Sequence, residues 1–285
     1  MQEEVEPGPT PESTPETPSP NPKSVRRRRV FKWTRWTTIE RELRREKGPL
    51  LAGVDEVGRG PIAGPVVACA VIMPPDTRAI AGVDDSKRLT HDQRVRLAAK
   101  IRERAVSFAL GAASVREIDT INIYQASVLA MHRALGRLSV KPDHVVIDGR
   151  AMRTLPIPHT AVVHGDARCY GIACASIVAK VLRDSLMRRL AKRYPSYGWE
   201  HNVGYATPEH IALIDEHGAT PHHRASFRVQ QLSLDLESDA ALASNLGAAD
   251  ALLEGQAGIA DVVSLDSLGG LLAGESVFPP GQLQQ

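Results

Sequence analysis

The chain has 285 residues, 42% of them hydrophobic and 24% charged, and a formal net charge of +2, so it is long enough for one or two domains. Its longest apolar run, residues 65–75, is too short to cross a bilayer. The N-terminus is acidic and rich in proline, unlike a secretory signal, so we expect a cytoplasmic protein without a membrane span.

The two ends of the chain differ in composition from the middle. Residues 1–22 contain seven prolines and five glutamates, and from Leu232 onward there is no Lys, Arg or His but eight Asp and Glu. Such segments bury too little apolar surface to offset the entropy cost of ordering. We therefore predict a disordered proline-rich and basic tail at 1–29 and a disordered acidic tail at 231–285.

Between the tails we predict a helical lead-in at 30–49 and one globular domain at 50–230. A single domain of about 185 residues has a normal size for one hydrophobic core. The three cysteines form no CxxC pair and lack zinc-type partners. We expect Cys69, Cys169 and Cys174 to be buried free thiols.

Hydrophobic periodicity and turn residues predict the elements of the first half of the domain. A glycine-rich turn at 58–61 is expected between the first two strands. A capping box of Thr90 and Gln93 is expected to start the second helix. The predicted elements, in chain order, are a helix over 37–47, strands over 50–55 and 66–73, a helix from Thr90 to Arg104, and a strand over 107–113.

The second half of the domain alternates between predicted helices and strands. Ser114 and Glu117 form another capping box, and Gly218 is expected to stop the final helix. The predicted elements are a short helix from Ser114, a helix over 123–138, strands over 144–147 and 160–163, a helix over 171–194, and a helix from Thr207. This order indicates an α/β domain with a mixed five-stranded sheet flanked by helices.

Acidic residues follow three of the predicted strands. Asp55 and Glu56 are expected at the end of the first strand, Asp148 at the end of the fourth, and Asp166 just after the fifth. Taken singly, Asp-Gly is first of all a turn signal, and Asp166 also fits a helix cap. Together, the four carboxylates repel one another without a cation, and their oxygens suit Mg²⁺ or Mn²⁺. The residues alone therefore predict metal-dependent phosphodiester chemistry.

Neighbouring residues on a strand point to opposite faces of the sheet. Asp55 and Glu56 therefore share one site only if the chain bends there. The glycines at 58 and 60 are consistent with such a bend.

Residues 50–230 resemble the ribonuclease HII family along nearly their whole length. The joint order of seven segments makes this resemblance specific: GVDEVGRGPIAGPVV from Gly53, DDSKRLT from Asp84, IDTINIYQAS from Ile118, VVIDG from Val145, HGD at 164–166, ACASIVAKVLRD from Ala173, and EHGATPHHRASF from Glu216. The related ribonuclease HIII enzymes lack the Gly-Arg-Gly form of the first segment, which favours HII.

The resemblance implies an RNase H-like fold with a small helical C-terminal subdomain. It implies an endonuclease that hydrolyses the RNA strand of RNA–DNA hybrids and cuts on the 5′ side of ribonucleotides embedded in duplex DNA, leaving 3′-OH and 5′-phosphate ends. It implies a metal-binding, catalytic set of Asp55, Glu56, Asp148 and Asp166. We expect a monomer.

The resemblance also implies residues that read the ribose 2′-OH. The matching positions here are Gly58, Arg59, Gly60 and Tyr205. The 2′-OH separates RNA from DNA locally, and backbone amides exposed by glycine can approach it. A half-buried core role is the alternative for Tyr205.

The long helix after Asp166 places Ser176, Lys180 and Asp184 on one face. We expect Lys180 to contact substrate phosphate or to stabilise the acidic cluster. Ser176 and Asp184 are expected to lie next to the metal-binding residues without binding the metal themselves. The alternative is an intrahelical Lys180–Asp184 pair of small value. Lys87 is a candidate contact to the nucleic-acid backbone, and a solvated side chain is its alternative.

One position departs from the family pattern, which has a His-Lys pair before Gly204-Tyr205. This chain has Asn202-Val203, with His201 one residue early. The change removes a positive charge and puts a phosphate contact there in doubt, but it leaves the four acids untouched.

Two tail motifs suggest partners. Arg26–Arg29, followed by Trp33 and Trp36, either grips nucleic acid by charge and stacking or forms a solvated linker with domain-capping tryptophans. The hexapeptide from Gln231 resembles the bacterial sliding-clamp-binding pattern, with Gln231, Leu232, Leu234 and Leu236 as its contacts; a fortuitous match is the alternative.

Two functional hypotheses of different class remain at this point. The first is the metal-dependent nuclease. The second is a catalytically inactive RNase H-fold module that binds nucleic acid, which retention of all four acids disfavours. A junction resolvase of the same fold is disfavoured by the residues that match 2′-OH readers.

Overall fold

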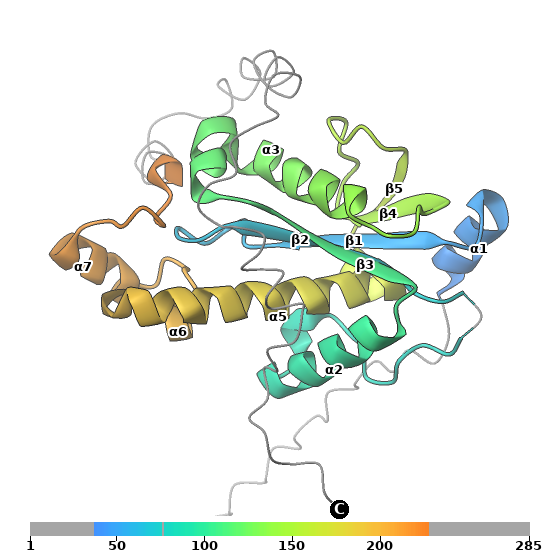
Figure 1. Cartoon of the computed structure of the whole chain (residues 1–285), viewed down its shortest axis with the longest axis horizontal. Coiled ribbons are helices and arrows are strands. Elements are labelled where there is room, and N and C mark those ends of the chain that lie inside the picture. The colour runs from blue at the N-terminus through green and yellow to red at the C-terminus, as the bar shows by residue number, and fades with distance from the viewer. Residues whose placement is uncertain (1–36, 76, 228–285) are drawn as a thin grey trace, which may run out of the picture. The chain divides into compact units, whose positions relative to one another are not determined.

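The computed structural model describes residues 37–75 and 77–227. Its centre is a five-stranded sheet with the order β3-β2-β1-β4-β5 (Figure 1). The first three strands pair antiparallel, and β1–β4 and β4–β5 pair parallel. The mixed sheet predicted from the sequence is therefore confirmed. The strands are β1 Leu51–Val57, β2 Val66–Ile72, β3 Ser107–Ala113, β4 His144–Asp148 and β5 His159–Val162.

The helices follow the predicted order, and the capping boxes at Thr90 and Ser114 are both present. The longer ones are α1 Thr38–Lys47, α2 His91–Arg104, α3 Val115–Gly136, α5 Tyr170–Arg193 and α7 Pro208–His217. Within α3, Asn122 has a left-handed φ of 67° and caps the chain that follows through Gln125 N. The predicted pair of helices therefore meets at Asn122.

Four short turns of helix were not predicted: the 3-10 helices η1 Ser86–Arg88 and η2 Pro195–Tyr197, and the α-helical turns α4 Gly165–Arg168 and α6 Trp199–Asn202. Segments of three or four residues are too short to show hydrophobic periodicity. Two of them carry residues predicted for the site, Lys87 in η1 and Asp166 in α4.

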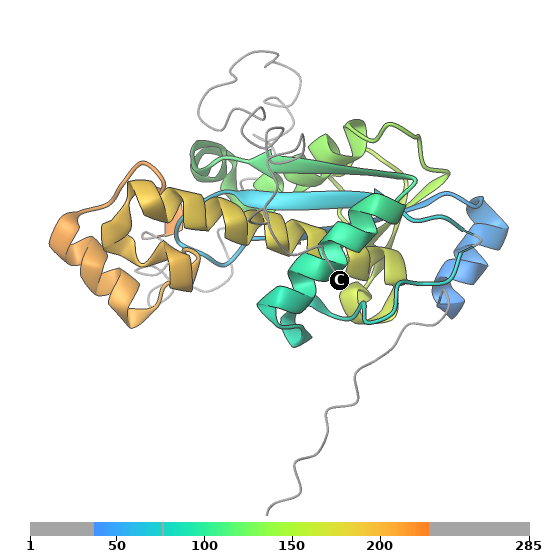
Figure 2. The ribbon, with the colours of Figure 1, turned by 60° about the horizontal axis from the view of Figure 1, so that its bottom comes forward.

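The sheet lies between two helical layers, with α3 on one face and α5 and α2 on the other (Figures 1 and 2). Val54 and Ile147 pack with Met131 of α3. On the other face, Val71 packs with Ile101 of α2 and Ile177 of α5. Because both faces are covered, β2 is buried along its whole length, as expected for a continuous apolar run.

A small helical part follows α5, as the resemblance implied. Trp199 of α6 is fully buried with Tyr197 and Ile214 of α7, and its Nε1 donates to His210 Nε2 at 3.0 Å. None of the helices in the described part of the chain combines the length and hydropathy needed to cross a membrane. Cys69, Cys169 and Cys174 are buried free thiols, as predicted.

Several predictions fall on residues that the structure does not describe. The disordered tails at 1–29 and 231–285, the Arg26–Arg29 run, and the hexapeptide at 231–236 all lie outside 37–227. The boundaries drawn at 30–49 and 50–230 stay predictions.

The backbones of β1 and α5 approach each other closely at Gly53 and Gly171. A Cβ added to Gly53 would lie 2.2 Å from Gly171 C and 2.5 Å from Gly171 O. Backbone atoms cannot yield as the end of a side chain can. The side-chain-free pair therefore allows α5 to lie directly on β1.

We predict that Gly53→Ala destabilises the fold by about 1–3 kcal/mol, the usual cost of overpacking a tight core. The matched control is Gly136→Ala at the end of α3, where an added Cβ meets nothing within 4 Å. That variant gains up to about 1 kcal/mol from helix propensity. Urea unfolding of both variants and the wild type measures the difference, and equal stabilities would refute the close-approach argument.

Candidate active site

Asp55 and Asp148 are brought together by the parallel pairing of β1 with β4. The register runs to Val54 opposite Ile147, so the next residue on each strand is an aspartate. Asp55 lies inside β1 rather than at its end, because β1 continues to Val57 in its pairing with β2. The predicted end of the first strand, at Asp55, was therefore wrong by two residues. The carboxyl end of β4 nevertheless lies beside Asp55.

Glu56 follows Asp55 in an unbroken strand, so the predicted bend after Asp55 is absent. Its side chain is only 10% exposed, and its Oε1 lies 3.2 Å from Arg59 Nη1. Burial raises the pKa of Glu56, the Arg59 guanidinium opposes that rise, and the Asp148 carboxylate adds to it. Glu56 therefore shares an electrostatic environment with Asp148 even though β1 does not bend.

Asp166 lies in the first turn of α4, just after β5. The turn is tied to Asp148, whose Oδ1 accepts a 2.6 Å hydrogen bond from Gly165 N. Asp166 is buried, with an exposure of 6%. Its Oδ2 lies 3.2 Å from Nζ of Lys87, whose side chain is otherwise exposed.

The electrostatics of Asp55 show how crowded this site is. Burial raises the pKa of Asp55 well above its usual value, and the Glu56 and Asp148 carboxylates raise it further. A hydrogen bond from the Ser176 hydroxyl acts in the opposite direction. Burial lowers the pKa of Lys87, but the charges of Asp166, Asp85 and Asp55 outweigh this, so the net shift is upward.

The charges of Asp55, Glu56 and Asp148 act on one another at the carboxyl ends of β1 and β4, where ligands of α/β sheets bind, and Asp166 follows Gly165, whose N donates to Asp148. Among the residues that the structure describes, no group of three or more His, Cys, Asp and Glu is gathered closely enough to hold a metal ion. Lys87 and Arg59 instead supply the positive charge. A set of oxygen donors that needs cations to offset its own repulsion fits a hard divalent ion.

Ser176, Lys180 and Asp184 share one face of α5, as predicted. Ser176 Oγ lies 3.0 Å from Ser86 Oγ and also bonds Asp55, so it supports the acidic group. Lys180 Nζ donates to Asp184 Oδ1 at 2.8 Å. The described contacts therefore place Lys180 in the intrahelical pair that was its alternative, and they show no bond from Lys180 to the four acids.

The residues expected to read ribose lie together beside the acids. Gly58, Arg59 and Gly60 form the exit from β1, and Tyr205 lies beside Gly60, with its Cε1 3.7 Å from the position of a Cβ on Gly60. Tyr205 is 44% exposed. Tyr205 is therefore not a fully buried core residue, and its role in reading the ribose stays a prediction.

The departure at Asn202-Val203 has a structural role. Asn202 Oδ1 accepts from Gly204 N and its Nδ2 donates to Tyr197 O, both at 2.8 Å. Val203 is partly buried against the Trp199 cluster and has a φ of 44°. These contacts shape the turn that leads into Tyr205.

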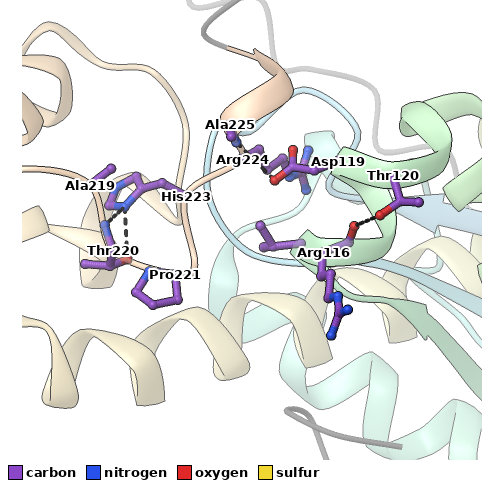
Figure 3. Close-up of a pocket in the computed structure, with 10 residues that line it drawn as sticks. Arg116, Asp119, Thr120, Ala219, Thr220, Pro221, His223, Arg224 and Ala225 are labelled. Carbon is purple, nitrogen blue, oxygen red and sulfur yellow. Dashed lines mark hydrogen bonds between the residues drawn. The ribbon is translucent and has the colours of Figure 1, made fainter. Parts of the chain in front are cut away.

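Sequence reasoning missed three polar residues around this site. Ser86 extends the Ser176 hydrogen bonds, and Arg183 and Arg224 are fully buried against the Gly58–Pro65 loop. Arg183 and Arg224 lie in two of the segments that resemble the family. Arginine is mostly exposed in proteins, so nothing in the sequence indicated that these two side chains are buried. A cavity of about 490 Å³ lies behind the loop, between the start of α3 and residues 219–225 (Figure 3). None of the four acids lines it.

Comparison with known proteins gives consistent matches. The family model described as Ribonuclease HII matches residues 52–230. A ribonuclease HII from Thermosynechococcus vestitus is 56% identical over 178 residues, which cover 62% of this chain and 83% of that protein.

Two solved structures share the fold. Ribonuclease H2 from Pyrococcus horikoshii has a TM-score of 0.56 at 25% identity, covering 64% of this chain and 96% of that one. The PCNA:RNase HII complex from Archaeoglobus fulgidus gives 0.52 at 22% identity, covering 67% and 98%. The RNase H-like fold is therefore confirmed.

We predict that Asp55→Asn stabilises the protein when divalent ions are removed. The folded-state pKa of Asp55 lies above its unfolded value near 3.9. The unfolded chain therefore releases this proton first, and stability falls as pH rises from about 4 through the raised pKa. The variant escapes that fall, so it is more stable than the wild type at pH 7. Urea unfolding in EDTA from pH 4 to 8 measures it.

The control for this prediction is Glu117→Gln. Burial raises the pKa of Glu117, but hydrogen bonds from Arg133 and Ser114 outweigh it, so the net shift is downward. Removing this carboxylate therefore lowers stability at pH 7. If both variants lose stability in EDTA, repulsion among the acids is not the dominant force at Asp55.

Proposed function

This chain belongs to the ribonuclease HII family of hydrolytic endonucleases that act on RNA–DNA hybrids, and we propose that its catalytic centre consists of Asp55, Glu56, Asp148 and Asp166. The observation that carries this proposal is the parallel register of β1 and β4, which sets Asp55 beside Asp148 with Glu56 next along β1. The hydrogen bond from Gly165 to Asp148 adds Asp166 to the same group.

The proposed cofactor is Mg²⁺ or Mn²⁺ held by these four carboxylates. Two such ions flanking a phosphodiester supply activation of water and stabilisation of the leaving oxygen. Ser176 bonds Asp55 and orients its carboxylate. Gly165 N does the same for Asp148. Lys87 and Arg59 pair with Asp166 and Glu56 from exposed positions, where their charges can also meet substrate phosphate.

We propose further that Gly58, Arg59, Gly60 and Tyr205 read the ribose next to the scissile bond. Their support is position: Tyr205, which is 44% exposed, lies beside Gly60, three residues beyond the end of the strand that carries Asp55 and Glu56. A 2′-OH held there favours cutting on the 5′ side of a ribonucleotide, with 3′-OH and 5′-phosphate ends. The substrates are RNA–DNA hybrids and duplex DNA with embedded ribonucleotides.

A sliding clamp is the proposed protein partner, bound through Gln231, Leu232, Leu234 and Leu236. The support is the Gln-Leu-x-Leu-x-Leu pattern directly after the family match, which ends at residue 230. Short linear motifs of this kind order on binding and act as weak recruiters. The Archaeoglobus fulgidus structure contains PCNA, but its likeness to this chain is limited to the fold.

A catalytically inactive binding module is the second hypothesis, and it is separated from the first by activity alone. The retention of all four acids favours the enzyme. We expect purified protein with Mg²⁺ or Mn²⁺ to cut a duplex containing one ribonucleotide, and EDTA to abolish the cut.

We predict that Asp148→Asn and Asp166→Asn each lower kcat by more than about a hundredfold, because loss of even a supporting partner of a metal ligand costs ten- to a hundredfold. Asn keeps an oxygen that accepts the hydrogen bond from Gly165 to residue 148, so folding is preserved. The control is Asp92→Asn on the exposed start of α2, which leaves kcat unchanged. Wild-type rates for either site variant at saturating Mg²⁺ would remove that residue from the catalytic set.

We predict that Tyr205→Phe lowers kcat/KM on a single embedded ribonucleotide by about two- to tenfold, the value of one hydrogen bond of 0.5–1.5 kcal/mol. The control is Tyr197→Phe. In the wild type the Tyr197 hydroxyl donates to Gly218 O, away from Gly58, Arg59 and Gly60. The variant loses stability but keeps its preference for the ribonucleotide over all-DNA duplex. An unchanged rate and preference in Tyr205→Phe would return that residue to a packing role.

A further inference from the structure

The loop that joins β1 to β2 has little secondary structure of its own. Between Gly58 and Pro65 its only strand-like contact is a single bridge from Ala63 to His223. Gly58 and Gly64 have φ values of 95° and 82°, a region that glycine populates freely. A glycine-rich loop of this kind needs external bonds to hold one conformation.

Arg224 supplies much of that restraint from the C-terminal segment. Its Nη2 donates to Gly58 O and Gly64 O at 2.6 and 2.7 Å, and its Nη1 donates to Arg59 O at 3.0 Å. The side chain is 1% exposed. One guanidinium therefore spans the two ends of the loop and the arginine between them.

Arg183 of α5 restrains the other side of the same loop. Its Nε and Nη2 donate to Pro65 O and Ala63 O, both at 3.0 Å, and its Nη1 donates to Val203 O at 2.9 Å. Ile62 N and Ala63 N both donate to Gly204 O. These bonds join the loop to the turn that carries Tyr205. The segment from Gly58 to Gly60 and Tyr205 are therefore held in a fixed position relative to each other.

The arrangement is electrostatically costly. Burial and the nearby Arg183 charge together lower the pKa of Arg224 to about 9, although the Asp119 charge opposes them. Burial likewise lowers the pKa of Arg183 to about 10. The hydrogen bonds described for these two cations go to backbone carbonyls. An apolar side chain would fill the space at lower cost, so packing alone does not account for two buried guanidiniums.

Arg224 is itself held in place by α3. Asp119 Oδ2 accepts from Ala225 N at 3.1 Å, and its Oδ1 accepts from Ser226 N and Ser226 Oγ. Figure 3 shows Asp119 of α3 beside Arg224 and Ala225. A chain of contacts thus runs from α3 through residues 225–226 to Arg224 and on to Gly58.

We propose that Arg224 is a positioning residue for ribose selection, which fixes the carbonyls of Gly58, Arg59 and Gly64 so that the loop faces Tyr205 in one geometry. The inference rests on the proposed function that this loop and Tyr205 read the ribose. Arg224 touches no substrate. It acts through the loop, with Arg183 holding the opposite side.

The test compares equilibrium binding of two duplexes that differ in one 2′-OH. One is all DNA and the other has a single embedded ribonucleotide, and both are titrated in EDTA so that neither is cut. The ratio of their Kd values measures ribose selection. Affinity for all-DNA duplex reports phosphate contacts, and urea unfolding reports stability.

Arg224→Lys keeps the charge but replaces the planar fork with a point donor. We expect it to lower the ribose preference by about tenfold or more, the size of a lost hydrogen bond to a charged group, while affinity for all-DNA duplex stays unchanged. The matched control is Arg137→Lys, since Arg137 also donates to a backbone carbonyl, Leu110 O, at the end of α3. It lowers stability without changing the preference.

Asp119→Asn is a second variant that leaves the guanidinium in place and weakens its anchor. It is expected to lower the preference by a smaller factor, and it decides the matter if Arg224→Lys does not fold. If the ribose preference falls in Tyr205→Phe but stays unchanged in the Arg224 or Asp119 variant, the positioning role of Arg224 is overturned, while the proposed ribose reading stands. No preference in the wild type, or none lost in Tyr205→Phe, overturns the proposed ribose reading itself.

Discussion

The contact on which the rest of the site depends is the packing of α5 directly on β1. Gly53 and Gly171 meet backbone to backbone, and this fixes the register of a 24-residue helix against the central strand. The same helix then presents Ser176 to Asp55 and Arg183 to the Gly58–Pro65 loop. A shift of α5 by one turn, about 5.4 Å, would separate both pairs at once.

The start of α5 is anchored by a residue far away in the sequence. Glu40 of α1 accepts hydrogen bonds from Tyr170 N and Gly171 N at 3.0 and 2.7 Å. It also completes a capping box with Thr37. Burial raises the pKa of Glu40, and the four hydrogen bonds to it oppose that rise. One carboxylate therefore caps two helices and docks α1 on the domain.

The cationic side chains around the site are of two kinds, exposed and buried. Asp55 and Asp166 are buried, while Lys87 and Arg59, which pair with Asp166 and Glu56, extend from exposed positions. Exposed side chains change orientation at little cost in free energy, so Lys87 and Arg59 are not fixed in these pairs. Arg183 and Arg224 are the opposite case, because burial and several backbone bonds hold each in one place.

Much of this molecule was readable from the sequence. Strands, helices and caps emerged from local periodicity and from Ser114 and Thr90, because those signals depend on neighbours within a few residues. The four acids emerged from strand ends and from the family resemblance. Asp55 lies within a strand that continues to Val57, since pairing with β2 extends β1 beyond the last local signal.

The tertiary structure alone decided what depends on distant partners. Nothing local to Glu40 indicates the start of α5, 130 residues away, and nothing local to Arg224 indicates Gly58, 166 residues away. Lys180 illustrates the same limit: its spacing allowed a contact to phosphate or a pair with Asp184, and the fold placed it on Asp184. Local sequence determines which elements form, but burial and long-range hydrogen bonds determine which side chains meet, because both depend on how the elements pack.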